Sequence, residues 1–267
     1  MSTARPPAIR RGYADSAFGQ LHYAECGTGA PIVLLHQTPR SWDEYREVLP
    51  ILGRTHRAIA VDTAGFGGSA PLAEHTIEAY ACSIVAFLDA MGLARTALVG
   101  HHTGGVIAVE VTAQAPERIE RLVLSSTPYV DEQGREERRH RPPIDHVDVD
   151  PNGGHLVEMW RRRQRLYPVD RPDLLGRLIH DALALDPADL EKGHEAVAQY
   201  VMEDRIGTVN CPVLCIGASA DPYGFPELEK LRAALPNAEV AVIEGGMVPL
   251  MEGHATEAAQ LIASFVG

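Results

Sequence analysis

The residues best suited to chemistry lie in a short glycine-rich segment, Gly100-His101-His102-Thr103-Gly104. Apolar residues precede this segment at 97–99, and an apolar run follows it from Val106. Small residues at a strand-to-helix turn let the backbone fold sharply and hold the central side chain in a strained, exposed position. The central side chain here is His102, whose imidazole can take up or release a proton near neutral pH. The spacing therefore predicts an acid/base group at this turn.

Short unbroken apolar runs predict the strands that must position the turn. They are residues 32–35, 58–61, 97–99, 122–124, 213–216 and 240–243. Because these runs do not alternate with polar residues, they suit strands buried on both faces, as in a parallel sheet covered by helices. Two alternating segments, residues 9–14 and 20–25, predict an antiparallel hairpin at the edge of the sheet.

Apolar residues at helical spacing fill the intervals between these runs. Ile77, Ile84 and Leu88 follow such a pattern, and Gly92 is placed to end that helix. Residues 258–265 predict a final helix in the same way. The alternation of strands and helices indicates a doubly wound α/β fold with a mostly parallel, eight-stranded sheet.

Residues 129–206 interrupt this alternation, because they show no good strand pattern. Helical patterns fall at residues 156–166, 174–185 and 194–202. An insertion of this length between two strands is usually functional. We expect a helical cap at 129–206, over the carboxyl ends of the strands, where such sheets bind ligands. Residues 1–128 and 207–267 are expected to form the core.

Five further segments carry motifs in a fixed order. They are His36-Gln37-Thr38-Pro39, Asp62-Thr63-Ala64-Gly65-Phe66-Gly67-Gly68-Ser69, Pro116-Glu117-Arg118-Ile119, Asp221 after a strand, and Gly245-Gly246-Met247-Val248-Pro249 with Glu252 beyond. Together with the turn at His102, these segments resemble motifs of the α/β-hydrolase family, and the resemblance extends over nearly the whole chain. The resemblance implies the fold of that family and places Asp221 at the position of its acid.

Two of the three catalytic positions implied by the resemblance hold other residues. His102 stands where the family has Ser, Cys or Asp, and Met247 stands where it has His. The nearest histidine, His254, is expected at the surface in the first turn of the last helix. These departures exclude a Ser-His-Asp acyl-enzyme mechanism.

The resemblance also implies that the turn and the acid lie one imidazole apart. We therefore predict that His102 meets Asp221 directly, with Met247 in the vacated place. The carboxylate would fix the tautomer and leave the other ring nitrogen for general acid/base work. The backbone N–H groups of Thr38 and Thr103 would form an oxyanion hole.

Six residues are expected around the substrate: His36, Gln37, Arg40, His101, Met247 and Trp160. His36 is also expected to pack beneath the loop that carries Thr38. We expect no metal site, because neighbouring histidines on a tight turn point in different directions and have no carboxylate nearby in the sequence. No cofactor is expected.

A base and an oxyanion hole without a hydroxyl nucleophile suit a non-covalent reaction on a small ester, lactone or carbonyl compound, as a hydrolase or a lyase. Attack by His102 itself through an acyl-imidazole is less favoured, since that step needs another base. A catalytically inactive protein that binds a small molecule as a sensor or carrier is the alternative. The retained Asp221 and the turn glycines favour an enzyme.

Composition limits the partners. The chain has 36 acidic and 24 basic residues and a net charge of −12, which disfavours nucleic acid. The basic run at 161–165 is interpreted as the solvated face of a helix. No stretch reaches the roughly 20 apolar residues of a membrane span, and residues 1–11 lack the apolar core of a signal peptide. We expect a cytoplasmic protein, and a homodimer is compatible with the sequence.

Overall fold

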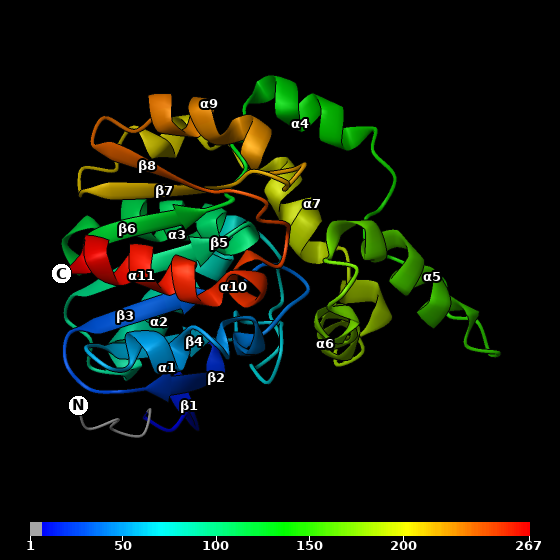
Figure 1. Ribbon diagram of the computed structural model, residues 1–267, viewed down its shortest axis with the longest axis horizontal. Helices are drawn as coiled ribbons and strands as arrows, with labels where there is room; N and C mark the ends of the chain where they lie inside the picture. The colour runs from blue at the N-terminus through cyan, green and yellow to red at the C-terminus, as the bar shows by residue number, and fades with distance from the viewer. Residues whose placement is uncertain (1–6) are drawn as a thin grey trace.

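Eight strands form one sheet in the computed structural model, which describes residues 7–267 (Figure 1). The strands are β1 (Arg10–Ser16), β2 (Gly19–Cys26), β3 (Pro31–Leu35), β4 (Arg57–Val61), β5 (Thr96–His101), β6 (Ile119–Ser125), β7 (Val213–Ala218) and β8 (Ala238–Ile243). Their spatial order is β1-β2-β4-β3-β5-β6-β7-β8. The pairs β1/β2 and β2/β4 are antiparallel, and the other neighbours are parallel.

The predicted eight-stranded, mostly parallel sheet is confirmed, and so is the antiparallel hairpin at its edge. Each apolar run identified in the sequence lies within one strand. The first six residues of the N-terminal segment, for which no signal peptide was expected, lie outside the described residues. No helix within residues 7–267 is long and apolar enough to cross a membrane.

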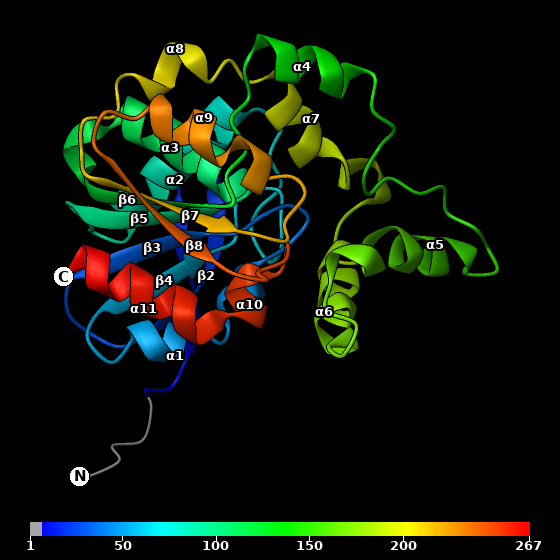
Figure 2. The same cartoon turned by 45° about the horizontal axis from the view of Figure 1, so that its top comes forward.

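Both faces of the sheet are covered by helices (Figures 1 and 2). On one face, Val33 and Leu98 pack in a core that includes residues of α2 (Ile77–Ala90), α3 (Thr103–Gln114) and α9 (Leu228–Ala233). On the other face, Leu34 and Val99 pack with residues of α1 (Leu49–Leu52), α10 (Leu250–Gly253) and α11 (Ala255–Val266). Successive strand residues point to opposite faces, so an unbroken apolar run serves both cores. Burial of this apolar surface stabilises the sheet by roughly 25 cal/mol per Å².

The chain between β6 and β7 forms only helices and connecting loops, and we call residues 129–206 the helical insertion. Its helices are α4 (Glu132–Arg139), α5 (Gly154–Arg163), α6 (Pro172–Ala182), α7 (Lys192–Gln199) and α8 (Glu203–Ile206). Figures 1 and 2 show α5 and α6 standing away from the sheet, with α7 between them and the core and α4 above α7 at the top of the molecule. The insertion begins after β6, beside the end of β5, because His101 pairs with Ser125.

Short 3₁₀ helices complete the secondary structure. They are η1 (Trp42–Tyr45), η2 (Pro116–Arg118), η3 (Gln164–Leu166), η4 (Pro187–Asp189) and η5 (Phe225–Glu227).

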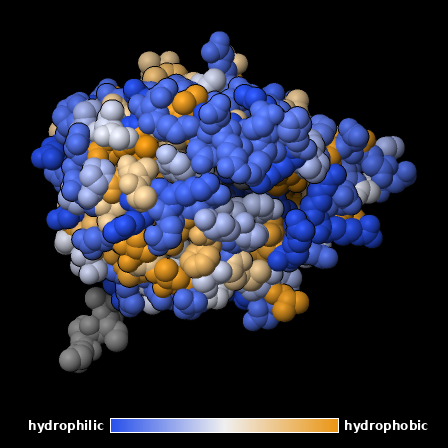
Figure 3. Space-filling model, turned by 90° about the horizontal axis from the view of Figure 1, so that it is seen from above, coloured by the Kyte–Doolittle hydropathy of each residue, from blue (hydrophilic) through white to orange (hydrophobic). Residues whose placement is uncertain are grey.

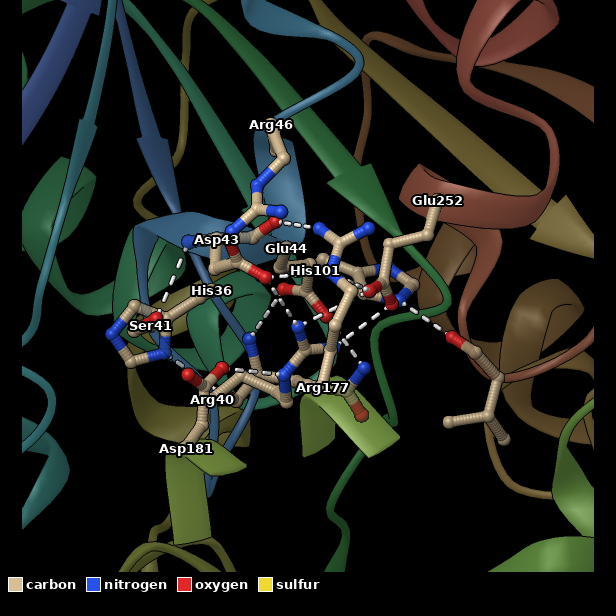
Figure 4. A network of polar contacts seen from close by, with 12 residues as sticks. His36, Arg40, Ser41, Asp43, Glu44, Arg46, His101, Arg177, Asp181 and Glu252 are labelled. Atoms are coloured by element: carbon tan, nitrogen blue, oxygen red, sulfur yellow. Dashed lines mark hydrogen bonds and ion pairs between the residues drawn. The ribbon is translucent and has the colours of Figure 1, made fainter. Parts of the chain in front are cut away.

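A network of buried charges attaches α6 to the core (Figure 4). Arg40, in the loop after β3, donates from Nε to Asp181 of α6 at 2.8 Å. The same guanidinium binds both oxygens of Glu252 in α10, at 2.8 and 3.1 Å. Arg177 of α6 donates to Asp43 of η1 at 2.6 Å. Burial raises the pKa of Glu252 to about 7, although the charge of Arg40 opposes this rise. The insertion is therefore attached to the core by buried side chains of opposite charge that neutralise one another.

This network predicts a large stability loss for Arg40→Met. Removal of the guanidinium leaves Asp181 buried without its arginine and leaves Glu252 with only the 3.5 Å contact to Arg177. The free energy of unfolding should therefore fall by about 3–5 kcal/mol in urea denaturation at pH 7. Arg46→Met is the matched control, because Arg46 also contacts Asp43 but its side chain is 53% exposed. We expect little change, because the Arg46 side of this pair is exposed and Asp43 keeps its contact with Arg177. An Arg40→Met protein as stable as the wild type would contradict the role given to the network.

Candidate active site

His102 occupies the sharp turn between β5 and α3. Its backbone angles are φ 49° and ψ −116°, a conformation that residues with a side chain rarely adopt. Glycines make the turn feasible, because a Cβ at Gly100 would lie 2.2 Å from the Gly104 oxygen and a Cβ at Gly104 would lie 2.1 Å from the Leu35 oxygen. The strained turn expected from the sequence is present, at a cost of about 1–3 kcal/mol.

The imidazole of His102 lies against the carboxylate of Asp221, which follows β7. Nε2 of the ring and Oδ2 of the carboxylate are 2.8 Å apart, and Asp221 is only 1% exposed. The geometry falls short of an aligned hydrogen bond, so among the described residues both atoms are buried without a hydrogen-bond partner. The pair is a close charge contact at hydrogen-bond distance.

Asp221 is fixed by its own surroundings. Its Oδ1 accepts the backbone N–H groups of Tyr223 at 2.9 Å and Gly224 at 3.2 Å. Burial alone raises the pKa of Asp221, but the charge of His102 and these N–H groups outweigh it and hold the pKa well below its usual range. An ionised Asp221 favours the tautomer of His102 that is protonated at Nε2. The opposite ring nitrogen, Nδ1, then carries no proton.

Thr38 and Thr103 lie together beside His102. Their hydroxyl oxygens are 3.0 Å apart, and both residues line the same cavity as the imidazole. Thr103 is the first residue of α3, so its backbone N–H precedes the hydrogen bonds of that helix. The structure thus brings together the two residues whose backbone N–H groups were expected to form an oxyanion hole.

The loop that carries Thr38 is held from two sides. Glu44, which is fully buried, accepts the backbone N–H of Gln37 at 2.9 Å and its side-chain amide at 2.5 Å. From the helical insertion, Gly193 of α7 packs so closely that a Cβ there would lie 2.5 Å from the Thr38 side chain. Any larger residue at 193 would displace Thr38 or α7, so this contact fixes the loop and the helix relative to each other.

A cavity of about 530 Å³ opens beside His102. This volume is within the range of about 300–1,000 Å³ that is usual for small-molecule sites. The core contributes Gln37, Thr38, His102 and Thr103 to its lining, and most of the other lining residues belong to the helical insertion. The arrangement can hold a small molecule with one face on the imidazole and the other on the helices.

Two of the residues expected around the substrate, His36 and Arg40, do not line the cavity. His36 bridges two backbone segments, donating from Nδ1 to the Gln37 oxygen at 2.7 Å and accepting the Thr63 N–H at Nε2, 3.0 Å away. Arg40 belongs to the buried charge network. Neither residue is in the cavity lining, so the expectation is corrected for both.

His101 is also removed from the cavity lining. Its Nε2 donates to the Val248 oxygen at 2.9 Å, and its Nδ1 accepts from the Ser125 hydroxyl at 3.1 Å. Burial lowers the pKa of His101, which keeps the ring neutral although the charge of Glu44 acts in the other direction. The rings of His101 and His102 meet edge to face with centroids 4.6 Å apart. The contacts of His101 are therefore with the turn and with neighbouring backbone.

Met247 and Trp160, which were also expected around the substrate, do not line the cavity either. Met247 is partly buried and does not line the cavity, whereas its neighbour Val248 does. Trp160 packs on an apolar cluster that contains Tyr167 and Leu174. Of the six residues expected to form the pocket, only Gln37 is in the lining.

A second histidine–carboxylate pair, which the sequence analysis did not predict, lies at the cavity wall, where His194 but not Asp145 is in the lining. Nε2 of His194 lies 2.8 Å from Oδ2 of Asp145, and both oxygens of Asp145 also accept hydrogen bonds from Arg163. Arg163 is only 5% exposed, so the interpretation of residues 161–165 as a solvated face is wrong at this position. Asp145 and Arg163 lie 18 positions apart in a segment with no strand pattern, so no spacing signal could pair them.

Within residues 7–267, no three His, Cys, Asp or Glu side chains gather in a way that could hold a metal ion.

Comparisons with known proteins bear on the family of the chain. Residues 30–200 match a family described as alpha/beta hydrolase fold. Bifunctional epoxide hydrolase 2 of Sus scrofa is 34% identical over 130 residues, which cover 47% of this chain and 23% of that protein. Haloalkane dehalogenase 2 of Mycobacterium tuberculosis is 35% identical over 115 residues, 42% of this chain and 40% of that protein. The polyketide synthase ThaQ of Burkholderia thailandensis is 29% identical over 252 residues, 88% of this chain and 12% of that protein. The matches thus span less than half of each relative.

Solved structures share the fold at low sequence identity. An enol-lactonase from Burkholderia xenovorans superposes with a TM-score of 0.80 at 19% identity, covering 96% of this chain and 99% of the other. An esterase from Exiguobacterium antarcticum gives a TM-score of 0.81 at 16% identity, covering 95% and 98%.

The lowered pKa of Asp221 predicts how Asp221→Asn changes stability with pH. A carboxylate whose pKa is lower in the folded than in the unfolded chain stabilises the fold above its unfolded pKa, near pH 4, and loses that contribution as the pH falls toward the folded value. At pH 7 the variant should lose about 1–3 kcal/mol of unfolding free energy, the usual range for hydrogen bonds to a charged group. Urea denaturation should show this gap narrowing below pH 4. A gap that widens in acid would contradict the assignment, and Asp170→Asn, at an exposed position, serves as control.

Proposed function

The chain belongs to the alpha/beta hydrolase fold family, and we propose that it hydrolyses a small ester or lactone with His102 as general base and without a covalent acyl-enzyme. The observation that carries this proposal is the 2.8 Å contact between His102 and Asp221 at the edge of a small-molecule cavity. The names of the similar proteins, which include epoxide hydrolase, haloalkane dehalogenase, enol-lactonase and esterase, support a hydrolase.

The first step is attack by water. Nδ1 of His102 takes a proton from a water molecule, and the water oxygen forms a bond to the carbonyl carbon of the substrate. Asp221 stays ionised and stabilises the imidazolium through its contact with Nε2. The carbonyl oxygen becomes an oxyanion, which accepts hydrogen bonds from the backbone N–H groups of Thr38 and Thr103.

The second step releases the alcohol. The tetrahedral intermediate re-forms the carbonyl, the bond to the leaving oxygen breaks, and His102 returns its proton to that oxygen. One water is consumed, and one carboxylic acid and one alcohol are formed, or a single hydroxy acid from a lactone. The cycle needs no redox group and leaves His102 neutral for the next turnover.

The strained turn supports a catalytic rather than a purely binding role. A protein that only holds a small molecule has no need of a φ of 49° at His102, which costs about 1–3 kcal/mol of backbone strain. An ionised, buried Asp221 next to that imidazole is likewise an arrangement found at catalytic sites.

His102→Asn should abolish most of the activity. Asparagine tolerates positive φ and keeps the turn, but its amide cannot take a proton, so kcat/KM for 4-nitrophenyl butyrate should fall by about 10²–10⁴-fold. His180→Asn is the matched control, because the His180 side chain is 87% exposed. Circular dichroism checks that both variants fold. Unchanged turnover in His102→Asn would refute the proposal, and binding of esters without turnover by the wild type would favour a sensor or carrier.

The absence of an acyl-enzyme can be tested directly. Rapid mixing of the wild type with excess 4-nitrophenyl butyrate should release 4-nitrophenol without a burst, because no intermediate accumulates on the protein. Intact-mass spectrometry of the quenched mixture should find the unmodified chain. A stoichiometric burst with a butyryl adduct on His102 would show that the imidazole is the nucleophile and not the base.

A further inference from the structure

Arginines crowd the cavity beside His102, although the chain has a net charge of −12. The five in its lining are Arg135, Arg138, Arg139, Arg141 and Arg163. Four of them pair with a carboxylate of this chain: Arg135 with Glu203, Arg139 with Glu136, Arg141 with Glu137 and Arg163 with Asp145. Arg138 is the exception.

Arg138, near the end of α4, has no carboxylate within ion-pair distance among the described residues. Its Nη1 donates to the carbonyl oxygen of Gly134, one turn earlier, at 3.1 Å. Burial lowers the pKa of Arg138, and the positive charge of Arg141 acts in the same direction, while the more distant charges of Glu227, Glu137 and Asp131 act against it. A partly buried guanidinium with no anion in direct contact is stabilised when an anion binds to it.

The carboxylates that line the cavity are already committed. Glu191 accepts the backbone N–H groups of Ile144, Asp145 and His146 at 2.8–3.2 Å. Glu195 pairs with Lys192 at 3.0 Å. Neither carboxylate contacts Arg138, so the guanidinium remains available to a ligand inside the cavity.

The helix that carries Arg138 is anchored to the rest of the protein. Asp131 caps it by accepting the Gly134 N–H at 2.7 Å and also accepts from Lys230 at 3.2 Å. Arg135 binds both oxygens of Glu203 in α8, at 2.6 and 2.9 Å. Seen from the side on which α4 lies, the surface is mostly hydrophilic (Figure 3). These contacts hold α4 in place, so Arg138 is presented to the cavity from a fixed helix.

We propose that Arg138 binds a carboxylate of the substrate, so that the ester or lactone hydrolysed at His102 carries a second, anionic group. The statement that this ligand is hydrolysed rests on the proposed function, whereas the binding of its carboxylate by Arg138 does not. One unpaired guanidinium offers a planar fork that matches one carboxylate in a bidentate arrangement. The imidazole and the arginine line one cavity of about 530 Å³, which accommodates a small molecule that spans both.

Binding is tested by titration calorimetry of the wild type with glutarate and with glutaramide, its neutral diamide. Glutarate should bind at least about tenfold more tightly, and Arg138→Gln should remove this preference, since the loss of a charged hydrogen bond costs about tenfold or more in affinity. Arg165→Gln is the matched control, because Arg165 is exposed and lies outside the cavity lining. Equal affinity for the two compounds, no detectable binding at millimolar glutarate, or a preference that survives in Arg138→Gln would overturn the inference.

Turnover separates this inference from the proposed function. The wild type should hydrolyse mono-4-nitrophenyl succinate with a higher kcat/KM than 4-nitrophenyl butyrate, and Arg138→Gln should reduce the ratio of the two values by about tenfold, through a higher KM for the succinate ester. Failure to hydrolyse either ester, with glutarate still bound through Arg138, would refute the hydrolase and leave the anion site standing. Hydrolysis of both esters with equal efficiency in all variants would refute the anion site alone.

Discussion

The close approach of Gly104 to the Leu35 carbonyl oxygen determines where the imidazole of His102 stands. No side chain fits at Gly100 or Gly104, so β5 can turn directly into α3 with His102 at φ 49°. The turn places the imidazole at the end of the sheet, against Asp221, which follows β7 on the far side of β6. The contact between the two side chains, the N–H of Thr103 and the cavity beside them all depend on this one steric constraint.

The arginines around the site differ in whether a carboxylate of the chain neutralises them. Arg40 and Arg163 are almost fully buried, and each is neutralised by carboxylates of the same chain. Such pairs hold the helical insertion and the cavity wall in a defined arrangement, although their net contribution to stability is small compared with the loss when one partner is removed. Arg138 differs because its guanidinium faces the cavity without a carboxylate from the described residues. The difference separates structural charges from one that can recognise a ligand.

The sequence predicted the sheet, its edge hairpin and the turn at His102, because each leaves a local pattern of apolar runs or glycines. The contact between His102 and Asp221 was also predicted, but from the family resemblance and not from any local pattern. The pocket was predicted poorly. His36 and His101 form backbone hydrogen bonds and do not line the cavity, and Arg40 binds Asp181, 141 positions away. Contacts over such separations follow from tertiary packing, which no spacing rule contains. The same holds for the pairing of Asp145 with Arg163 and His194.

The central claim is that Asp221 holds His102 in the tautomer that leaves Nδ1 free as a base. Nitrogen-15 NMR of the histidine rings measures this directly, because protonated and unprotonated ring nitrogens have well-separated chemical shifts, and His102→Asn assigns the signal. The account predicts that neutral His102 carries its proton on Nε2, toward Asp221, and that Asp221→Asn weakens this preference. A neutral ring protonated on Nδ1 would contradict the account, since that nitrogen could not then accept a proton from water.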